Sequence, residues 1–400
     1  MNFLNQTRDY DAIVVGARAA GSATALLMAR QGLDVLVVDR APYGSETTST
    51  HALLGPGVML LQQWGVLDAV VAAGTPAIEA TTMNYYDETS ATKEAVSFDL
   101  TGRPLYAPRR TVIDPLLADM ASLAGADVRF ETPVRDLIRG HDGSVEGAVV
   151  STSSGESEVR APLVVGADGL RSFVARQVDA PITYRGKSAT ACITAYFDGV
   201  DLPGAYNWYH GVEGAAGSIP TNDGLYSVFA AVSDRRFRTQ LRDDTTGAFG
   251  SVIDQVAPEL AEHMKDASQA TRFRSFPGER SFTRTAAGPG WALVGDAGAF
   301  IDPMTAHGMS AAFRDAQACA DAAVCTLDSS DTDNAWGHYE HKRDEVSRPM
   351  IDAVDDVAAF RHPLDRVQQA HIKLSKIVGG EAAEILGAQD TFDPCSRAAA

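Results

Sequence analysis

Residues 11–40 constrain the fold more than any other stretch, because they combine two buried-strand patterns with a glycine turn and a helix. An apolar run at residues 12–15 ends at Gly16, and a second run at residues 35–38 is closed by Asp39. Good helix formers lie between the two runs, so the expected order is strand, turn, helix, strand. Two strands joined through a helix pair in parallel with a right-handed crossover. The segment therefore predicts a Rossmann-like α/β unit.

The turn after the first strand, from Gly16 to Gly21, has the residues of a dinucleotide phosphate site. Gly16 permits the tight turn, and Gly21 lets the helix and the strand approach each other. The free amides at the start of the helix face the phosphates, and Asp39, 18 residues after Gly21, is spaced to bind an adenosine ribose. Arg18 replaces the middle glycine of the motif. The pattern fits FAD and NAD equally, and the alternative is a unit that binds no nucleotide.

Composition narrows the class of protein and of partner. The 400 residues, 45% of them hydrophobic, correspond to two or three domains at about 150 residues per domain. With 34 basic against 52 acidic residues, the net charge of −18 argues against nucleic acid or an anionic membrane as a partner. No apolar run reaches the ~18 residues of a membrane span, and the four cysteines are scattered. We therefore expect a cytoplasmic protein with no membrane span and no disulfide framework.

The rest of the chain shows two kinds of strand pattern. Residues 163–172 and 291–296 each read as a buried strand that ends in an Asp-Gly or Gly-Asp turn, which is typical of the parallel sheet. Residues 80–100 and 188–282 instead alternate apolar and polar positions between Gly, Pro and Asn turns, which predicts an inserted antiparallel sheet that serves as the substrate platform. An Ala-rich helix is expected over residues 309–327.

The expected domain boundaries follow from these two patterns. We expect a discontinuous nucleotide-binding domain, a substrate-binding β-sheet domain and a C-terminal helical segment, the helices being broken by Pro349 and Pro363 and followed by disorder from Thr391. The expected ranges are residues 1–80, 108–186 and 283–335 for the first, 81–107 and 187–282 for the second, and 336–400 for the third.

The order of these signals resembles the FAD-dependent para-hydroxybenzoate hydroxylase superfamily, which includes aromatic hydroxylases, flavin-dependent halogenases and geranylgeranyl reductase-like enzymes. The resemblance covers about residues 11–324 and rests on the segments at residues 16–21, 166–169 and 295–296. It implies a Rossmann-like FAD-binding domain with an inserted antiparallel sheet and C-terminal helices.

The resemblance assigns one set of residues to the ADP half of FAD. The turn would cradle the pyrophosphate through Gly16, Ala17, Ala20 and Gly21. Asp39 and Arg40 would meet the adenosine, and the backbone at Val134 would touch the adenine.

A second set would meet the flavin half. Arg110 matches the arginine that reaches the flavin phosphate or ribityl chain, and Asp296 would bind the ribityl hydroxyls. Pro303 would lie against the isoalloxazine, and the amides of Gly308 and Met309 would face its N1–C2=O edge, where a helix N-terminus stabilises the reduced anion.

Asp168 matches an Asp-Gly motif that in the hydroxylases serves both FAD and NAD(P)H. The arginine that follows this motif by seven residues is displaced here, since position 175 is Ala and the arginine is Arg176. The Trp-x-Trp-x-Ile-Pro signature of halogenases is also absent, because Ala215 and Gly217 precede Ile219-Pro220. Halogenation is therefore not expected, and the small residues are expected to open space in the substrate site.

The resemblance implies an NAD(P)H-dependent monooxygenase in which O2 adds at the flavin C4a carbon and one oxygen atom passes to a small aromatic or polycyclic substrate. The alternatives are an FAD-dependent reductase or dehydrogenase of the geranylgeranyl reductase type and a flavin-binding protein without turnover. His51 and His307 are the candidate catalytic side chains.

The aromatics that could line the substrate face are Tyr196, Trp208, Tyr209 and Tyr226. No metal site is expected, because His338 and His341 lack a third ligand in the sequence. The substrate, the choice of NADH or NADPH, the mode of flavin attachment and the oligomeric state stay open.

Overall fold

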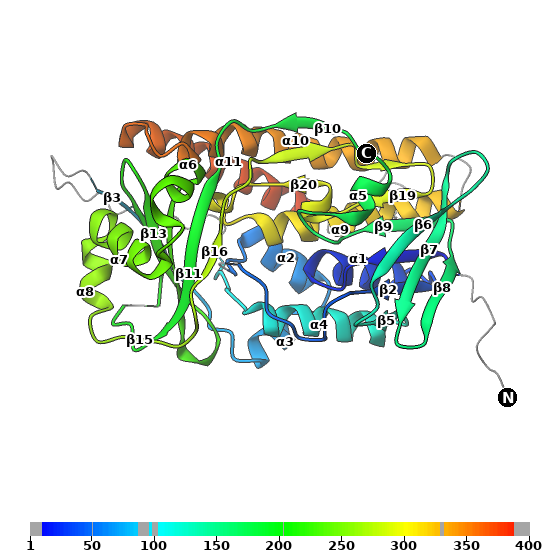
Figure 1. Cartoon of the computed structure of the whole chain (residues 1–400), viewed down its shortest axis with the longest axis horizontal. Helices are drawn as coiled ribbons and strands as arrows, with labels where there is room; N and C mark the ends of the chain where they lie inside the picture. Colours follow the sequence, from blue (N-terminus) through cyan, green and yellow to red (C-terminus); the bar gives the residue numbers. More distant parts are fainter. Residues whose placement is uncertain are drawn as a thin grey trace.

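The computed structural model describes residues 10–49, 51–86, 96–97, 103–202, 204–328 and 332–387. One half of the molecule, on the right in Figure 1, is built on sheet A, whose strand order is β18-β19-β9-β1-β2-β5. All of these strands run parallel except β18, which confirms the expected Rossmann-like topology. The strands are β1 (Ala12–Val15), β2 (Val35–Val38), β5 (Asp127–Arg129), β9 (Leu163–Gly166), β18 (Ala287–Gly288) and β19 (Trp291–Leu293).

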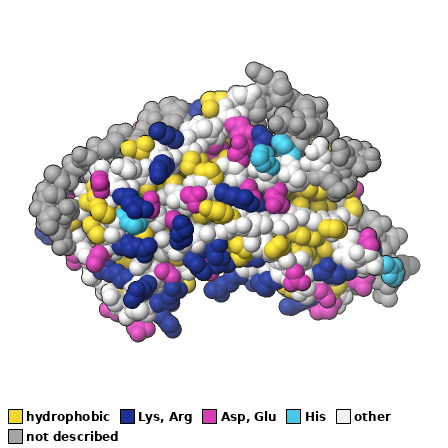
Figure 2. Space-filling model, turned by 90° about the horizontal axis from the view of Figure 1, so that it is seen from above, with side chains coloured by type: hydrophobic (Ala, Val, Ile, Leu, Met, Phe, Trp, Pro, Cys, Tyr) yellow, Lys and Arg dark blue, Asp and Glu magenta, His cyan; other side chains and the backbone are white. Residues whose placement is uncertain are grey.

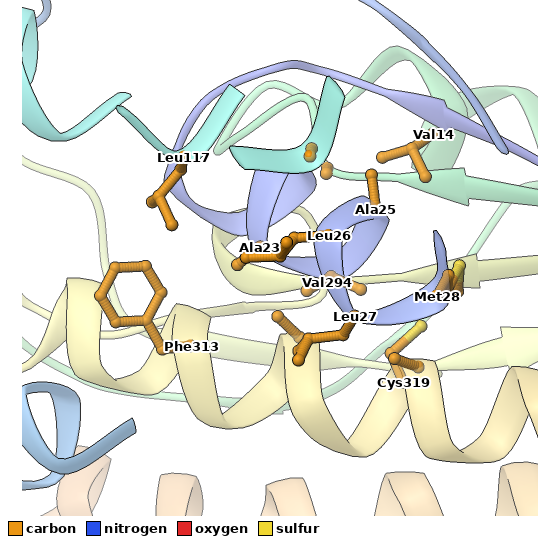
Figure 3. Packing of buried hydrophobic residues seen from close by; sticks show 14 of the residues in the cluster. Val14, Ala23, Ala25, Leu26, Leu27, Met28, Leu117, Val294, Phe313 and Cys319 are labelled. Carbon is orange, nitrogen blue, oxygen red and sulfur yellow. The ribbon is translucent and has the colours of Figure 1, made fainter. Parts of the chain in front are cut away.

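Helix α1 (Ala19–Arg30) is the centre of the core on this side of the molecule. It is buried along nearly its whole length, as its Ala-rich sequence allows close packing. Figure 3 shows its side chains between Val14 of β1, Leu117 of α4 (Arg110–Leu123) and Phe313 and Cys319 of α9 (Gly308–Asp328). Since α1 is held on several sides, the turn that precedes it has a fixed position at the carboxyl edge of sheet A.

The other half of the molecule is built on sheet D, in the order β15-β11-β14-β13-β12-β3-β4, with β16 also paired to β11. Its strands pair antiparallel as expected, apart from the parallel pair of β12 and β3. Strands β3 and β4, both within residues 80–100, pair antiparallel, and residues 87–95 between them lie outside the described residues. The strands are β3 (Thr81–Tyr85), β4 (Val96–Ser97), β11 (Thr190–Asp198), β12 (Tyr206–His210), β13 (Ala215–Pro220), β14 (Tyr226–Ser233), β15 (Ser268–Gln269) and β16 (Arg274–Phe276).

Smaller elements complete the structure. Sheet E contains β6 (Val134–Arg139), β7 (Val145–Thr152) and β8 (Gly155–Arg160), and sheet F contains β10 (Ile182–Arg185), β17 (Phe282–Arg284) and β20 (Ala299–Phe300). The shorter helices are α2 (Gly55–Gln63), α3 (Leu67–Ala72), α5 (Phe173–Gln177), α6 (Asp234–Arg236), α7 (Thr245–Val256) and α8 (Pro258–His263).

Two long C-terminal helices, α10 (Thr332–Ala358) and α11 (Leu364–Gly387), lie along the upper side of Figure 1. The expected break at Pro349 is wrong, because α10 continues through it. Three apolar residues after Pro349 are fully buried, namely Met350, Ile351 and Val354. Their packing offsets the cost of a proline inside a helix, about 3 kcal/mol. Pro363 does stand at a boundary, directly before α11. The tail from Thr391 lies outside the described residues.

The face seen from above carries both signs of charge. Figure 2 shows Lys and Arg side chains interspersed with Asp and Glu side chains over this face. Although the net charge of the chain is −18, basic side chains are thus present on this face as well. Within the part of the chain that the structure describes, no helix combines the length and the apolar character needed to cross a bilayer.

Candidate active site

The turn at the start of α1 is shaped by contacts that only glycine permits. Gly16 has a φ of +110°, and a Cβ there would lie 2.5 Å from the carbonyl oxygen of Ala167, just after β9. A Cβ on Gly21 would lie 1.8 Å from the carbonyl oxygen of Gly16. Real Cβ contacts are essentially never shorter than 3.0 Å. The first turn of α1 is therefore pressed directly onto the ends of β1 and β9.

Two carboxylates hold the amides of this turn. The amide of Ala17 donates to Oδ2 of Asp39 (2.8 Å), and the amide of Ala19 donates to Oδ1 of Asp114 (3.1 Å). Oδ1 of Asp39 also accepts the amide of Ala41 (2.7 Å). The amides of Ala17 and Ala19 thus donate to carboxylates of the protein itself. Asp114, which enters from α4, was not singled out from the sequence as a binding residue.

Two guanidinium groups offset these carboxylates. Arg110 pairs with Asp114 (Nη2 to Oδ2, 2.9 Å), and Arg18 donates from Nη2 to Oγ of Ser45 (3.3 Å). Burial and the charge of Arg110 lower the pKa of Arg18, and the charges of Asp114 and Asp39 oppose this shift. Arg18 therefore supplies positive charge where the family motif has a glycine.

A small pocket lies beside this charged turn. It has about 240 Å³ of empty space, and its lining comprises Ala17, Arg18, Asp39, Pro42, Gly44, Ser45, Asp114, Pro115 and Phe130. The amide of Thr132 donates to the carbonyl oxygen of Asp39 (2.7 Å), which brings the start of β6, at Val134, towards this pocket. Arg40, the residue after Asp39, is exposed.

Asp168 lies next to the turn, since a Cβ on Gly16 would come within 3.2 Å of its amide. Oδ2 of Asp168 accepts the amides of Phe173 (2.6 Å) and Val174 (3.3 Å) at the start of α5. Oδ1 is buried and has no hydrogen-bond partner among the described residues. Burial raises the pKa of this carboxyl. A ligand hydroxyl that donated to Oδ1 would supply the missing hydrogen bond.

The end of β19 brings the flavin-side residues to the same sheet edge. Gly295 has a φ of +60°, and a Cβ there would lie 3.0 Å from Cβ of Ala20 and 3.5 Å from Cβ of Ala312. The first turns of α1 and α9 therefore meet at Gly295, immediately before Asp296. The Asp296 side chain is exposed to solvent. Even so, the protein atoms packed around its carboxyl raise its pKa to about 6 by desolvation, against the opposing charge of Arg110.

Helix α9 begins at Gly308, which is exposed, and continues into the buried Met309. The first amides of an α-helix have no partner within the helix, so this end of α9 can offer donors to a ligand. The sequence-predicted groups at Gly16, Asp39, Asp168, Asp296 and Gly308 thus meet at the carboxyl edge of one parallel sheet.

His51 is held in a buried pair with Tyr196 of β11. Nε2 of His51 and the Tyr196 hydroxyl are hydrogen-bonded, and the two rings stack with an interplanar angle of 7°. The guanidinium of Arg109 lies 4.7 Å from the centroid of the Tyr196 ring. Burial, followed by the charges of Arg110 and Arg109, lowers the pKa of His51 to about 3, and burial raises the pKa of Tyr196 to about 12. The pair is therefore neutral, and its proton stays on the Tyr196 oxygen.

The loop before α9 is anchored by Asp302. This buried carboxylate accepts the amides of Thr190 (2.8 Å) and Met304 (3.0 Å), and burial raises its pKa to about 6. It ties the 3-10 helix at residues 303–305, which begins with the half-buried Pro303, to the start of β11.

His307 is fully buried at the end of this loop. Its Nε2 lies 2.7 Å from Oε2 of Glu381 on α11. Although burial raises the pKa of Glu381, the neighbouring His307 and Arg314 hold it below its usual value. The imidazole is thus directed at the C-terminal helix, while Thr305 and Ala306 line a cavity.

That cavity lies between sheet D, α11 and the Pro303 loop. It has about 800 Å³ of empty space, counting its open mouth. Its walls are mostly apolar and include the aromatic rings of Tyr206 and Trp208. The lining residues are Leu54, Ile78, Glu79, Ala80, Thr81, Met83, Arg103, Leu105, Tyr206, Trp208, Met304, Thr305, Ala306, His371, Leu374, Ser375 and Val378.

Two of the aromatic residues expected at the substrate face lie on the other side of sheet D, because successive side chains of a strand point to opposite faces. Tyr209 and Tyr226 belong to the cluster that packs against α7 on the opposite face of sheet D, so they do not line this cavity. The space expected at Gly217 is also absent, because a Cβ there would lie 2.5 Å from Cε1 of Phe229 on the adjacent β14. Phe229 fills the place of the missing aromatic.

His371 of α11 lines the cavity beside His210 of β12, and neither residue was recognised as functional from the sequence. The only signal was the alternation of Tyr206, Trp208 and His210, which places these side chains on one face of the strand. The partner from α11 could not be deduced, since nothing local in the sequence relates the two segments.

A family model described as an FAD binding domain matches residues 9–354. The chain belongs to this family. The predicted resemblance to para-hydroxybenzoate hydroxylase-type flavoproteins is thereby confirmed, and the protein is an FAD-dependent oxidoreductase.

Relatives of this FAD-dependent oxidoreductase include enzymes of different reactions. It is 23% identical over 346 residues to the 1H-pyrrole-2-carbonyl (peptidyl-carrier protein) brominase of Pseudoalteromonas luteoviolacea, covering 82% of this chain and 80% of that protein. It is 27% identical over 341 residues to the digeranylgeranylglycerophospholipid reductase of Methanosarcina mazei, covering 80% and 77%.

Solved structures share the fold. The flavin-dependent brominase Bmp2 superposes with a TM-score of 0.79 at 21% identity, covering 96% of this chain and 98% of that one. PqsL, a probable FAD-dependent monooxygenase from Pseudomonas aeruginosa, superposes with a TM-score of 0.76 at 18% identity, covering 91% and 100%.

The residues at the carboxyl edge of sheet A, together termed the flavin groove, fit the charge and the hydrogen-bonding groups of FAD. Arg18 and Arg110 supply positive charge beside the turn, and the unpartnered Oδ1 of Asp168 can accept a ligand hydroxyl. The start of α9 offers helix amides at the other end.

Proposed function

We propose that the protein is a monooxygenase that uses NADH or NADPH and O2 to insert one oxygen atom into a small aromatic or polycyclic substrate. The balanced reaction converts substrate, O2, NAD(P)H and one proton into hydroxylated substrate, NAD(P)+ and water. Bound FAD supplies hydride acceptance and oxygen activation, which are the difficult chemistry. The task of the chain is to bind the flavin, orient the substrate and exclude water.

The proposal gives the groove residues distinct tasks. Gly16, Ala17, Ala20 and Gly21 would bind the pyrophosphate, with the charges of Arg18 and Arg110 close by. Asp39, Arg40 and Val134 would contact the adenosine, and Asp168, Asp296, Pro303, Gly308 and Met309 would contact the remainder of FAD.

The His51–Tyr196 pair is the proposed hydrogen-bonding element between the flavin groove and the cavity. His51 has a φ of +63°, and residues with side chains adopt this conformation at a cost that often marks functional sites. The loop that carries His51 continues to Leu54, which lines the cavity. On the other side, the charge of Arg110 in the flavin groove helps to lower the pKa of His51. The pair would hold its proton on the Tyr196 oxygen and pass it only when a reacting group draws it away.

The single observation that supports oxygenation is the largely apolar cavity bounded by the loop of Pro303. Oxygen transfer requires that water be kept from the reacting atoms. A cavity walled by Tyr206, Trp208 and aliphatic side chains is suited to that purpose. A flat aromatic substrate would stack on these rings at little polar cost.

A second candidate is an FAD-dependent reductase of a carbon–carbon double bond, and the reductase relatives favour it. The same apolar cavity would accept an isoprenoid. In that case reduction would proceed without O2, and the cavity would only need to hold a chain rather than a ring.

Parallel aerobic and anaerobic assays separate the two candidates. The purified holoprotein is screened with planar aromatics and with isoprenoid alkenes, recording NAD(P)H oxidation, O2 consumption and product mass. The monooxygenase proposal expects O2, NAD(P)H and product in equal amounts, with an oxygen-18 atom from labelled O2 in the product. Formation under argon of a product that carries two more hydrogens, one added as a hydride and one as a proton, would instead support the reductase.

A further inference from the structure

A buried cluster of three ring side chains lies at one wall of the large cavity, and one of the three lines that wall. Tyr85 comes from β3, His210 from β12 and His371 from α11. The centroids of the two imidazoles are 4.4 Å apart, and the Tyr85 ring lies 5.8 Å from each of them. Of the three, His371 lines the cavity. The cluster therefore connects the C-terminal helix to sheet D at the cavity wall.

The hydrogen bonds of this cluster are incomplete. The Tyr85 hydroxyl and Nδ1 of His371 are 2.8 Å apart. Nε2 of His371 and Nε2 of His210 are buried and have no hydrogen-bond partner among the described residues. His371 is only 5% exposed, so bulk water does not readily serve this nitrogen. A buried nitrogen without a partner raises the free energy of the folded state, and a ligand that pairs with it gains specificity.

The remaining chemistry of the wall limits what such a ligand can be. Burial lowers the pKa of His371 to about 4 and the pKa of His210 well below its usual value, so both imidazoles are neutral near pH 7. The charged lining residues, Glu79 and Arg103, are exposed, which keeps charge at the solvent side. The interior is therefore suited to an uncharged molecule.

The direction of the hydrogen bond at Nε2 depends on the tautomer. If the Tyr85 hydroxyl donates to Nδ1, then Nε2 carries a hydrogen and donates; if it accepts from Nδ1, then Nε2 is an acceptor. A hydroxyl group can pair with Nε2 in either case, whereas an ether oxygen or an amine cation fits at most one. The flat rings of Tyr206 and Trp208 nearby favour a planar body for the molecule that carries this hydroxyl.

We propose that His371 is the specificity-determining residue of the cavity, pairing through Nε2 with an uncharged hydroxyl group on a planar ligand while Tyr85 and His210 hold its ring. A small rotation of the ring turns Nε2 towards a seated ligand, as side chains commonly do on binding. The inference rests on the proposed function only in assigning the cavity to an organic substrate, since recognition itself requires no turnover.

The test compares two probes of the same shape, 2-naphthol and 2-methylnaphthalene, titrated into oxidised holoprotein without NAD(P)H and followed by the flavin absorbance and by calorimetry. We expect wild-type protein to bind 2-naphthol at least tenfold more tightly. His371→Gln places an amide near the position of Nε2 and should retain this preference, whereas His371→Asn places it near Nδ1 and should abolish it. His341→Asn, the same change at an exposed position of α10, should leave the preference unchanged.

A wild-type protein that binds both probes equally or binds neither overturns the inference, as does an Asn variant that keeps the full preference. A purely structural role predicts similar losses for Asn and Gln in both probes, so the split between the two variants is decisive. The proposed function fails separately. If no compound supports O2-dependent turnover but the probe preference depends on His371 as stated, the recognition role stands without the oxygenation.

Discussion

Replacing Gly21 with alanine should disable the flavin site through a backbone collision. The added Cβ would lie 1.8 Å from the carbonyl oxygen of Gly16, whereas ordinary van der Waals contact begins at 3.4 Å, so the two atoms must move well apart. Both partners are fixed to the backbone, and no side-chain rotation relieves the contact. Overpacking of this kind costs about 1–3 kcal/mol, which exceeds the ~0.5–1 kcal/mol that alanine gains over glycine inside a helix.

The same displacement moves the turn that holds the phosphates. Any shift of Gly16 also strains the 2.8 Å hydrogen bond from the amide of the adjacent Ala17 to Asp39. We expect the dissociation constant of FAD to rise at least tenfold, about 1.4 kcal/mol, and the melting temperature of the apoprotein to fall by a few degrees. Fluorescence titration of apoprotein with FAD and a thermal melt measure the two effects.

Gly337→Ala is the matched control for this change. Gly337 lies within α10, and a Cβ there would meet nothing within 4 Å. This variant should bind FAD as the wild type does and be slightly more stable. A Gly21→Ala protein with wild-type FAD affinity and an unchanged or raised melting temperature would refute the argument that the turn is held by close backbone contact.

Other changes test the charges and the buried histidines. Arg18→Ala should weaken FAD binding about tenfold at low ionic strength, with a smaller difference in 1 M salt because charges are screened there; the exposed Arg361→Ala should bind FAD normally, and a titration at two salt concentrations measures both. Tyr196→Phe removes the hydroxyl paired with His51 and should cost about 1–3 kcal/mol of unfolding free energy, measured by urea denaturation, while a cost near zero would contradict the pairing. Burial lowers the pKa of His51 to about 3 and that of His371 to about 4, so between pH 6.5 and pH 4 the unfolded chain binds protons that the folded chain does not. The free energy of unfolding should fall with acidification by up to about 1.4 kcal/mol per pH unit for each histidine, and His371→Asn should make the fall shallower in urea titrations at pH 7 and pH 5.

The parts of the fold that the sequence predicts are those with a local signature. The β1–α1–β2 unit has its strand period, its turn glycines and its closing carboxylate within 30 consecutive residues. Parallel strands share a carboxyl edge, so a Gly or Asp signal after each strand was enough to place Asp168 and Asp296 near the turn. The family resemblance then supplied the roles of these residues.

The parts that could not be predicted depend on partners far along the chain. Helix α10 continues through Pro349 because its apolar side chains are buried against neighbouring elements, which the local cost of proline does not reveal. Asp114 accepts a hydrogen bond from the amide of Ala19, although only the tertiary packing of α4 against α1 brings the two residues together. The assignment of Tyr209 to the substrate face failed because strand periodicity predicts two faces but not which of them meets the cavity.

Helix α11 supplies several residues of the cavity wall, yet it begins at Leu364, beyond the last residue of the family match at 354. One wall of the cavity is consequently encoded downstream of the stretch that carries the cofactor-binding residues. Substitutions on α11 can change what the cavity admits while leaving the redox apparatus intact. An engineer who wishes to redirect such an enzyme would therefore begin with the inward positions of this helix and leave the glycine turn untouched.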